Sequence, residues 1–245
     1  MIVADFRVMW FLSVKTFRVL VCLLMMSVNV LAQEREMLPV DWNKIRKEVE
    51  DNPQRVKDLV ARLSAVSLDT TLTYQDRILA FYGQSFLTND KEELMVFDMD
   101  DQKRQGKLSE CIATSKKILD INPLNLKALN TVVFALYTMK KDSTLNDGGI
   151  MAEDIEQYAN RAMRIYNTIA MTGDGSQEHP FYVTKVSDEY SFMRYYLDLW
   201  EYKGQTATTC CDIITLAENS DYYQQPTIYF EITRVYELER IMFKK

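Results

Sequence analysis

The segment Gly106–Leu129, GKLSECIATSKKILDINPLNLKAL, constrains the fold of this 245-residue chain more than any other stretch. Small and apolar residues recur in it at three-, four- and seven-residue steps, which places them on one face of a helix. They are Leu108, Cys111, Ile112, Ser115, Ile118 and Leu119. Gly106 suits the left-handed exit of a preceding helix, and Asn122-Pro123 predicts where this one ends. Because a helix of about a dozen residues cannot cover its own apolar stripe, the sequence predicts neighbouring helices around it.

The same residues resemble the tetratricopeptide repeat. Gly106-Lys107-Leu108 matches its turn, Glu110-Cys111 stands where the repeat usually has Glu-Ala, and Asn122-Pro123 closes its second helix. Ser115 replaces the preferred aromatic residue, and Ile118 replaces the preferred alanine. The next helix carries apolar residues near the expected positions, namely Leu129, Val132, Val133, Leu136 and Tyr137. Stacked repeats need about three units to bury a continuous core, so we expect other parts of the chain to cap this one.

Helix-start signals predict three short helices on the N-terminal side of this segment. Asp41 is placed to cap the first helix, Asn52-Pro53 to cap and start the second, and Thr73 to cap the third. The apolar stripes after these starts are Trp42, Ile45 and Val49; Val56, Leu59, Val60 and Leu63; and Ile78, Leu79, Phe81, Tyr82 and Phe86. The aromatic side chains of the third helix favour a packed core.

Residues 88–101 are charged and less regular. We expect Leu94 and Phe97 to be the anchors of this stretch and its charged side chains to form a solvated face. The aspartates of Asp98–Asp101 do not predict a calcium loop, because the glycine and the bidentate glutamate that such a loop needs are out of place.

The clearest helix is predicted at residues 155–170, after a loop at 140–149 that ends the helix begun at Leu126. Beyond Gly173–Ser176 the hydrophobic period changes from that of a helix to that of a strand. Extended segments are predicted at residues 181–186, 199–206, 209–216 and 227–235, with a short helix capped by Ser187.

This order indicates an α+β fold with N-terminal helical hairpins packed on a small C-terminal antiparallel sheet. We divide the chain into a leader, 1–32, a helical repeat-like region, 33–172, and a small α+β region, 173–245. The helix at 155–170 is expected to cover one face of the sheet, and the end of the chain, 236–243, is either a helix or a continued strand.

The N-terminus has the features of a secretory signal peptide. Basic residues precede an apolar run at 19–30, and Ala32 offers a small residue at the cut. An uncleaved membrane anchor is the alternative, although the run is short for a span. Cleavage would remove three positive charges and one negative charge and change the net charge from −6 to −8. An acidic chain without a basic cluster argues against nucleic acid or an anionic membrane as a partner.

Cysteine and histidine usage offers little for catalysis or metal binding. Cys111 belongs to the apolar stripe and is expected in the core. Adjacent Cys210 and Cys211 should point to opposite faces of a strand, which argues against a bond between them and against a redox or zinc motif. His179 is the single histidine, beside Pro180 in a polar loop, so we expect it exposed and predict no cofactor or metal site.

Two sets of residues near the C-terminus leave alternatives open. Asp188 and Glu189 open a short helix, where negative charge is favourable, but a pair of acids could also serve a glycoside hydrolase. An aromatic cluster favours a core role but could stack on a sugar or peptide. Its members are Tyr195, Tyr196, Trp200 and Tyr202.

Five motifs in order resemble an exported bacterial family known as a domain of unknown function. They are Asp69–Thr73 with Tyr82-Gly83, Gly106–Leu129, Gly173–Gly175 with Phe181–Val183, Ser187–Tyr190, and Thr227–Phe230. The resemblance implies export and a helical region joined to a sheet, and it implies no activity.

Together these features predict an exported, non-enzymatic protein-interaction protein that binds a peptide segment or a partner protein on its helical hairpins. The compartment would be the periplasm or the cell exterior. Two alternatives stay open: a glycan hydrolase that uses two carboxylates, and a small-ligand binder lined by aromatic side chains. The hydrolase would need two acids about 5 to 10 Å apart in a cleft, and the ligand binder would need exposed rings in a pocket.

Overall fold

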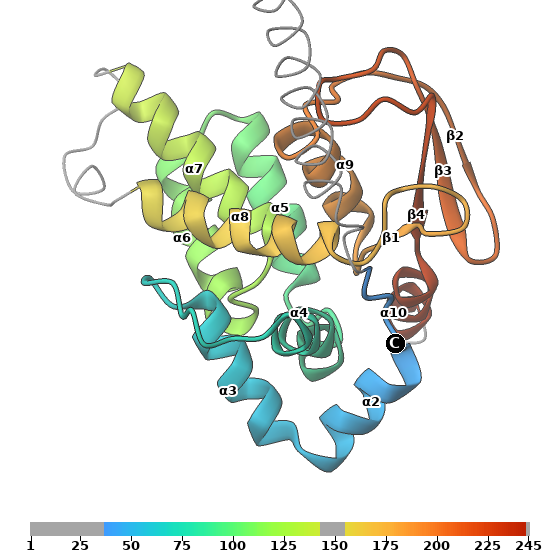
Figure 1. The fold of residues 1–245 in the computed structure, drawn as a ribbon. Helices are drawn as coiled ribbons and strands as arrows, with labels where there is room; N and C mark the ends of the chain where they lie inside the picture. The colour runs from blue at the N-terminus through green and yellow to red at the C-terminus, as the bar shows by residue number, and fades with distance from the viewer. Residues whose placement is uncertain (1–36, 143–154, 244–245) are drawn as a thin grey trace, which may run out of the picture. The chain divides into compact units, whose positions relative to one another are not determined.

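Short helices packed side by side make up most of the part of the chain that the structure describes (Figure 1). The computed structural model describes residues 37–142 and 155–243. Its helices are α2 (Trp42–Asp51), α3 (Pro53–Ser64), α4 (Tyr74–Thr88), α5 (Glu93–Arg104), α6 (Leu108–Ile121), α7 (Leu126–Lys141), α8 (Ile155–Ala170), α9 (Val186–Tyr195) and α10 (Thr233–Phe243). Its strands are β1 (Phe181–Tyr182), β2 (Tyr202–Ala207), β3 (Cys211–Leu216) and β4 (Thr227–Glu231). The predicted leader and residues 143–149 of the predicted loop at 140–149 lie outside the described residues, whereas residues 140 and 141 belong to α7 rather than to the loop.

The predicted N-terminal helix starts are confirmed. Asp41 caps α2 by accepting hydrogen bonds from the backbone amides of Asn43 and Lys44. Thr73 and Asp76 form a reciprocal capping box at the start of α4. Pro53 begins α3 as predicted, whereas the side chain of Asn52 makes no capping hydrogen bond.

Helix α6 is the buried centre of the helical part. Its predicted stripe is confirmed, since Cys111, Ile112, Ser115, Ile118 and Leu119 are all buried. Gly106 turns the chain between α5 and α6 with a φ of 71°, a backbone conformation that residues other than glycine rarely adopt. Consecutive helices pack against each other from α5 through α8, so each covers the apolar face of the next.

The prediction for residues 88–101 is wrong in two respects. Most of this stretch is helical, and Leu94 and Phe97 are 75% and 55% exposed. Val96 and Met99 provide the buried contacts of α5 instead. The helix was missed because its apolar residues sit on both faces, which masks the period that a one-sided helix shows.

The small sheet has the strand order β1-β4-β3-β2 and is mixed rather than antiparallel. Strands β2, β3 and β4 form the predicted antiparallel pairs, with Ile214 beside Ile228, but β1 pairs with β4 in parallel. The prediction of an antiparallel sheet is wrong for β1 because α9 and the β2–β3 hairpin intervene, so β4 returns in the direction of β1. The strand predicted at 227–235 ends at Glu231, and α10 follows it.

Helix α9 joins the sheet to the helices. Phe192 on α9 packs edge-on against Phe181 of β1 and Phe230 of β4, with ring centroids 4.8 and 6.4 Å apart. Its ring also lies 6.3 Å from Tyr166 of α8. We expected α8 itself to cover the sheet, but α9 lies between them. The described residues form one compact unit.

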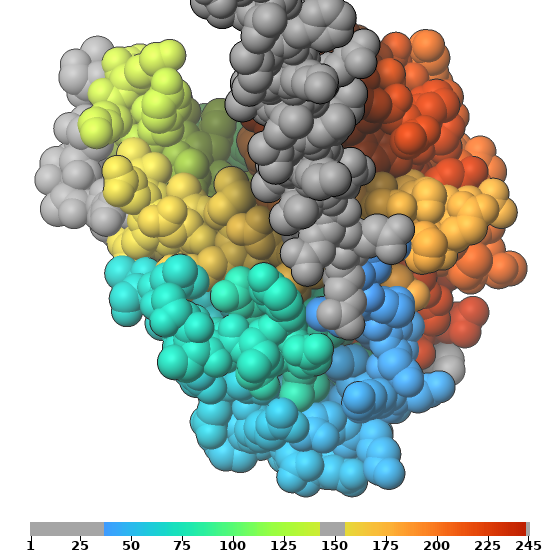
Figure 2. Space-filling model, viewed as in Figure 1, coloured from blue at the N-terminus to red at the C-terminus, as the bar shows by residue number. Residues whose placement is uncertain are grey.

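The C-terminal helix α10 binds back onto the N-terminal helices. The Arg234 guanidinium, which is 1% exposed, donates to the Ser85 carbonyl and to Asn89 Oδ1 at 2.7 and 2.8 Å, and its carbon lies 3.8 Å from the Phe86 ring centroid. Glu237 accepts from Arg46 on α2 at 2.8 Å. In Figure 2 the blue surface of α2 and the red surface of the C-terminal segment adjoin.

Candidate functional site

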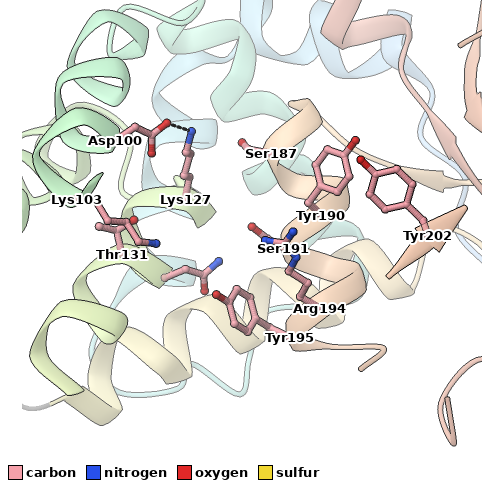
Figure 3. Close-up of a pocket in the computed structure, with 11 residues that line it drawn as sticks. Asp100, Lys103, Lys127, Thr131, Ser187, Tyr190, Ser191, Arg194, Tyr195 and Tyr202 are labelled. Carbon is pink, nitrogen blue, oxygen red and sulfur yellow. Dashed lines mark hydrogen bonds and ion pairs between the residues drawn. The ribbon is translucent and has the colours of Figure 1, made fainter. Parts of the chain in front are cut away.

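A cleft of about 460 Å³ opens where α5, α7, α9 and β2 meet (Figure 3). Its volume lies in the range of small-molecule sites. We call it the α9 cleft and define it by the residues that line it: Asp100, Lys103, Lys127, Asn130, Thr131, Ser187, Tyr190, Ser191, Arg194, Tyr195 and Tyr202.

Helix α9 supplies one wall because its polar residues recur at helical spacing. Counted from Ser187, the other polar residues follow after three, four, seven and eight positions, so all of them share one face of the helix. They are Tyr190, Ser191, Arg194 and Tyr195. The opposite face carries Phe192 and Met193, which are buried. The amphipathic pattern thus turns a hydrogen-bonding surface toward the cleft.

A buried cluster of charges fixes the start of α9. Lys185 Nζ lies 2.9 Å from Asp90, 2.8 Å from Glu93 and 3.4 Å from Glu92. Burial lowers the pKa of this amine, but the three carboxylates outweigh it and raise the pKa above its usual value. Asn122 donates to Glu92 at 2.7 Å, so the turn between α6 and α7 joins the same cluster. The cluster therefore positions the cleft wall relative to three other helices.

The cleft carries an excess of positive charge although the chain as a whole is acidic. Lys127 forms an ion pair with Asp100, the single acidic residue of the lining. Lys103 Nζ lies 4.4 Å from the centroid of the Phe134 ring. Arg194 is exposed and forms neither an ion pair nor a hydrogen bond with any residue that the structure describes. Its planar fork of donors remains free for a carboxylate or phosphate.

Tyrosine rings border the charged part of the cleft. The rings of Tyr190 and Tyr202 lie side by side with centroids 5.8 Å apart, as Figure 3 shows. Tyr195 and Tyr202 are 48% and 44% exposed, and Trp200 next to Tyr195 is 55% exposed. The prediction of a core role is therefore wrong for these three rings, because they project from the edge of α9 and β2. Tyr196 instead stacks on Phe192, as a core residue would.

The acidic pair at the start of α9 has two different roles. Asp188 lies at the helix start, as predicted, and it accepts from Thr184 Oγ1 at 2.9 Å and from the Lys185 amide at 3.1 Å. Burial raises the pKa of Asp188 to about 6, against the lowering effect of these bonds. The predicted cap, Ser187, is wrong, because α9 begins one residue before it and Lys185 is the cap residue. Glu189 does not cap the helix, since its side chain is buried and points toward the sheet residue Asp212.

Glu189 and Asp212 form a buried pair of carboxyl groups behind the cleft wall. Burial, together with the adjacent Asp212 and Asp188 carboxylates, raises the pKa of Glu189 to about 10. Glu189 is therefore protonated at neutral pH and can donate to Asp212. The Asp212 carboxylate also accepts from Gln205, which in turn accepts from the hydroxyl of Tyr190. A chain of polar groups thus links this pair to a tyrosine of the cleft.

The remaining candidate residues lie outside the cleft lining. His179 is exposed in a loop, as predicted, with Nδ1 4.0 Å from Asp174 Oδ2. Cys111 is buried and its thiol lies 3.5 Å from the Met99 carbonyl oxygen. Cys210 and Cys211 do not point to opposite faces, since their Sγ atoms are 3.2 Å apart. The prediction is wrong because Cys210 lies in the bend before β3, where strand alternation does not apply.

The model of one protein family, a domain of unknown function (DUF4919), matches residues 43–240. The chain belongs to the DUF4919 family. No curated protein and no solved structure matches it. The DUF4919 match spans α3 through β4 whole, so both the helices and the sheet that enclose the α9 cleft belong to the family domain.

Within the described part of this DUF4919 chain, no helix has the length and apolar character that crossing a membrane requires. The same residues contain no group of three or more His, Cys, Asp or Glu side chains arranged to hold a metal ion. The lining of the α9 cleft offers arginine, lysine, hydroxyl and amide groups for recognition.

Sequence reasoning missed the basic residues of the cleft. Lys103, Lys127 and Arg194 are separated by 24 and 67 positions, and no local motif connects them. The polar stripe on α9 is the one signal of the cleft in the sequence. A helix with serine, tyrosine and arginine on one face turns that face away from the core, toward solvent or a ligand.

Proposed function

We propose that this protein is a non-enzymatic binding protein that holds a small anionic ligand with an aromatic or similarly flat group in the α9 cleft. The observation that carries the proposal is the unpaired Arg194 at a tyrosine-lined cavity of about 460 Å³. A carboxylate or phosphate would bind the guanidinium in bidentate fashion. Tyr195 and Tyr202 would cover a flat group with their exposed rings.

The charge of the site supports an anion over a neutral sugar. Three basic side chains and one acidic side chain line the cleft, in a chain of net charge −6. A clustered charge of one sign in a concave site raises the local concentration of ligands of the opposite sign. Serine, threonine and asparagine side chains in the lining supply further hydrogen bonds.

The arrangement gives less support to the hydrolase alternative. Glycoside hydrolysis needs two acids on either side of the scissile bond in an open cleft. Asp188 and Glu189 are 3% and 0% exposed, and neither lines the cleft. Asp100, which does line it, is held in an ion pair with Lys127.

The test compares benzoate with benzamide, its neutral isostere, by chemical-shift perturbation of the isotope-labelled protein. We expect benzoate to shift the amide signals of α9 and β2, and benzamide to bind at least about tenfold more weakly. Arg194→Gln should weaken benzoate binding about ten- to a hundredfold, the effect of losing hydrogen bonds to a charged group.

Arg240→Gln serves as the matched control, because Arg240 is an exposed arginine of α10 outside the cleft lining. Its benzoate affinity should equal that of the unchanged protein. Equal affinity for benzoate and benzamide, or unchanged benzoate binding by Arg194→Gln, would refute the proposal.

A protein partner is the second candidate function, and the exposed apolar side chains of α5 favour it. Leu94 and Phe97 are three residues apart on one outer face of this helix. Large exposed apolar groups that adjoin mark interaction surfaces. Cross-linking in the native cell should capture a partner that the double variant Leu94→Ser, Phe97→Ser loses, while benzoate binding stays the same.

Export is also part of the proposal, supported by the basic and apolar composition of residues 1–32. We expect the mature protein to begin at Gln33 and to fractionate with the periplasm or the medium. N-terminal sequencing of the protein from its native cell tests this, and an intact N-terminus in the cytoplasm would contradict it.

A further inference from the structure

Two sulfur atoms lie next to each other at the hairpin between β2 and β3. The Sγ atoms of Cys210 and Cys211 are 3.2 Å apart, with Cys210 exposed and Cys211 half-buried. The other cysteine that the structure describes, Cys111, is buried among the helices. Among the residues that the structure describes, this hairpin is therefore the one place where two neighbouring thiols are accessible to a reagent in solution.

Hydrogen bonds hold the backbone that carries the pair. Thr208 Oγ1 accepts from the Cys211 amide at 3.0 Å and donates to the Cys211 carbonyl at 2.9 Å. The amide of Ile232 donates to the Cys210 carbonyl at 2.8 Å. Because both residues are tied to the sheet and its continuation, the closeness of the sulfurs follows from a fixed turn.

The two thiols differ in exposure and so in the order in which they react. Burial and the neighbouring Cys210 sulfur together raise the pKa of Cys211 to about 12. Cys211 therefore keeps its proton and can hydrogen-bond to Cys210. The thiolate is the reactive form of cysteine, so the exposed Cys210 is the sulfur that attacks first.

We propose that Cys210 and Cys211 form a reversible thiol–disulfide exchange site whose co-substrate is a disulfide of a small thiol compound. This site is independent of the ligand proposed for the α9 cleft. The exposure of Cys210 gives access, and the Sγ separation of 3.2 Å puts the second sulfur within reach of the first.

The exchange takes two steps. First, the Cys210 thiolate attacks one sulfur of the co-substrate, whose sulfur–sulfur bond breaks, and the other half leaves as a thiolate that gains a proton from water. Second, Cys211 releases its proton to solvent and attacks Cys210 Sγ, and the second half of the co-substrate leaves as a thiol. The pair thus loses two electrons and two protons, and the co-substrate is reduced to two thiols.

The resulting bond would be easy to reduce again. Adjacent Cα atoms are about 3.8 Å apart across a trans peptide, which is shorter than the roughly 4.4 Å lower limit of ordinary disulfides. Geometry outside that range makes a disulfide labile rather than a permanent cross-link. A site of this kind exchanges electrons with its surroundings and contributes little to the stability of the fold.

The test exposes the reduced full-length protein to oxidised glutathione, blocks remaining thiols with iodoacetamide and weighs the tryptic peptide Gly204–Arg234. We expect this peptide to be lighter by two hydrogens, to carry neither glutathione nor the blocking group, and to return to the dithiol with dithiothreitol. A peptide that keeps glutathione, or that carries two blocking groups, would overturn the proposal.

Single variants separate the two steps. Cys211→Ser should retain one glutathione on Cys210, and Cys210→Ser should react at least about tenfold more slowly, since the buried thiol remains protonated. Circular dichroism establishes that both variants are folded.

Phenylarsine oxide gives a second readout, because it condenses with two neighbouring thiols and releases water. One equivalent should bind the unchanged protein and none should bind at this hairpin in either variant; binding there by a single variant would contradict the pair.

Discussion

Glu189 shows how one side chain can make the stability of this protein depend on pH. It is fully buried beside Asp212, and burial raises its pKa from 4.5 to about 10. The folded state therefore binds a proton that the unfolded state releases above about pH 4.5. By linkage, this group makes the free energy of unfolding fall as the pH rises from 4.5 toward 10.

Glu189→Gln should remove that dependence. A neutral amide of the same shape can donate to Asp212 without first being protonated, so we expect the variant to be more stable at pH 8 by roughly 1 to 3 kcal/mol. The gain should shrink to nothing near pH 4.5. Urea unfolding at a series of pH values measures this difference.

An exposed glutamate provides the control for this prediction. Glu218→Gln lies in the turn after β3 and should leave the free energy of unfolding unchanged across the same pH range. If Glu189→Gln lowered the stability equally at every pH, Glu189 would be charged in the folded state and the pair with Asp212 would not share a proton.

At the scale of helices and strands, local signals predicted the elements that have one apolar face. The caps at Asp41 and Thr73, the stripes of α3 and α6 and the helix at residues 155–170 are confirmed, because a cap and a period of 3.6 are properties of short stretches. Helix α5 lacks a one-sided pattern, and β1 pairs with a strand about fifty positions away. Neither the helix α5 nor the pairing of β1 can therefore be predicted from neighbouring residues alone.

The α9 cleft could be predicted in part. The polar stripe of α9 is visible in the sequence. The sequence also places the tyrosines in one group, for which both a core role and stacking on a ligand are open. The basic side chains of the cleft come from three helices, and they meet only because of how these helices cross. They are Lys103 of α5, Lys127 of α7 and Arg194 of α9. Tertiary packing decides this, and a single sequence does not display it.

The contact between α3 and α4 depends on a glycine. A Cβ added to Gly83 of α4 would lie 2.8 Å from Val56 Cγ1 of α3 and 3.4 Å from Val49 of α2. Gly83→Ala should therefore destabilise the protein by about 1 kcal/mol, since overpacking of roughly 1 to 3 kcal/mol outweighs the higher helix propensity of alanine, worth about 1 kcal/mol.

Thermal unfolding of Gly83→Ala beside Gly204→Ala checks this prediction. Gly204 lies in β2 with no atom within 4 Å of an added Cβ, so its substitution should cost little. A Gly83→Ala protein with a raised melting temperature would mean that α3 and α4 move apart freely.

At the scale of the whole described unit, α10 connects the sheet to the first helices. Arg234 is held by Ser85, Asn89 and Glu237, and Trp42 of α2 donates to Glu231 at the end of β4 at 2.9 Å. The two ends of the unit therefore stabilise each other. We expect its helices and its sheet to unfold in one transition.

Arg234→Met should lower the free energy of unfolding by about 3 kcal/mol, because it leaves buried acceptors on α4 without a donor. Circular dichroism, which reports the helices, and tryptophan fluorescence, to which Trp200 near the sheet contributes, should shift together. Arg240→Met, on the exposed face of the same helix, should have little effect. Two separate transitions in Arg234→Met would show that the sheet and the helices are independent.

The bonds between the ends of the described unit also bear on how it acquires its structure during synthesis. Trp42 and Arg46 are joined to acceptors that lie 189 and 191 positions later. The first helix leaves the ribosome long before β4 and α10 exist, and until then its apolar side lacks these partners. The native arrangement of α2 can therefore form only once translation has passed Glu237.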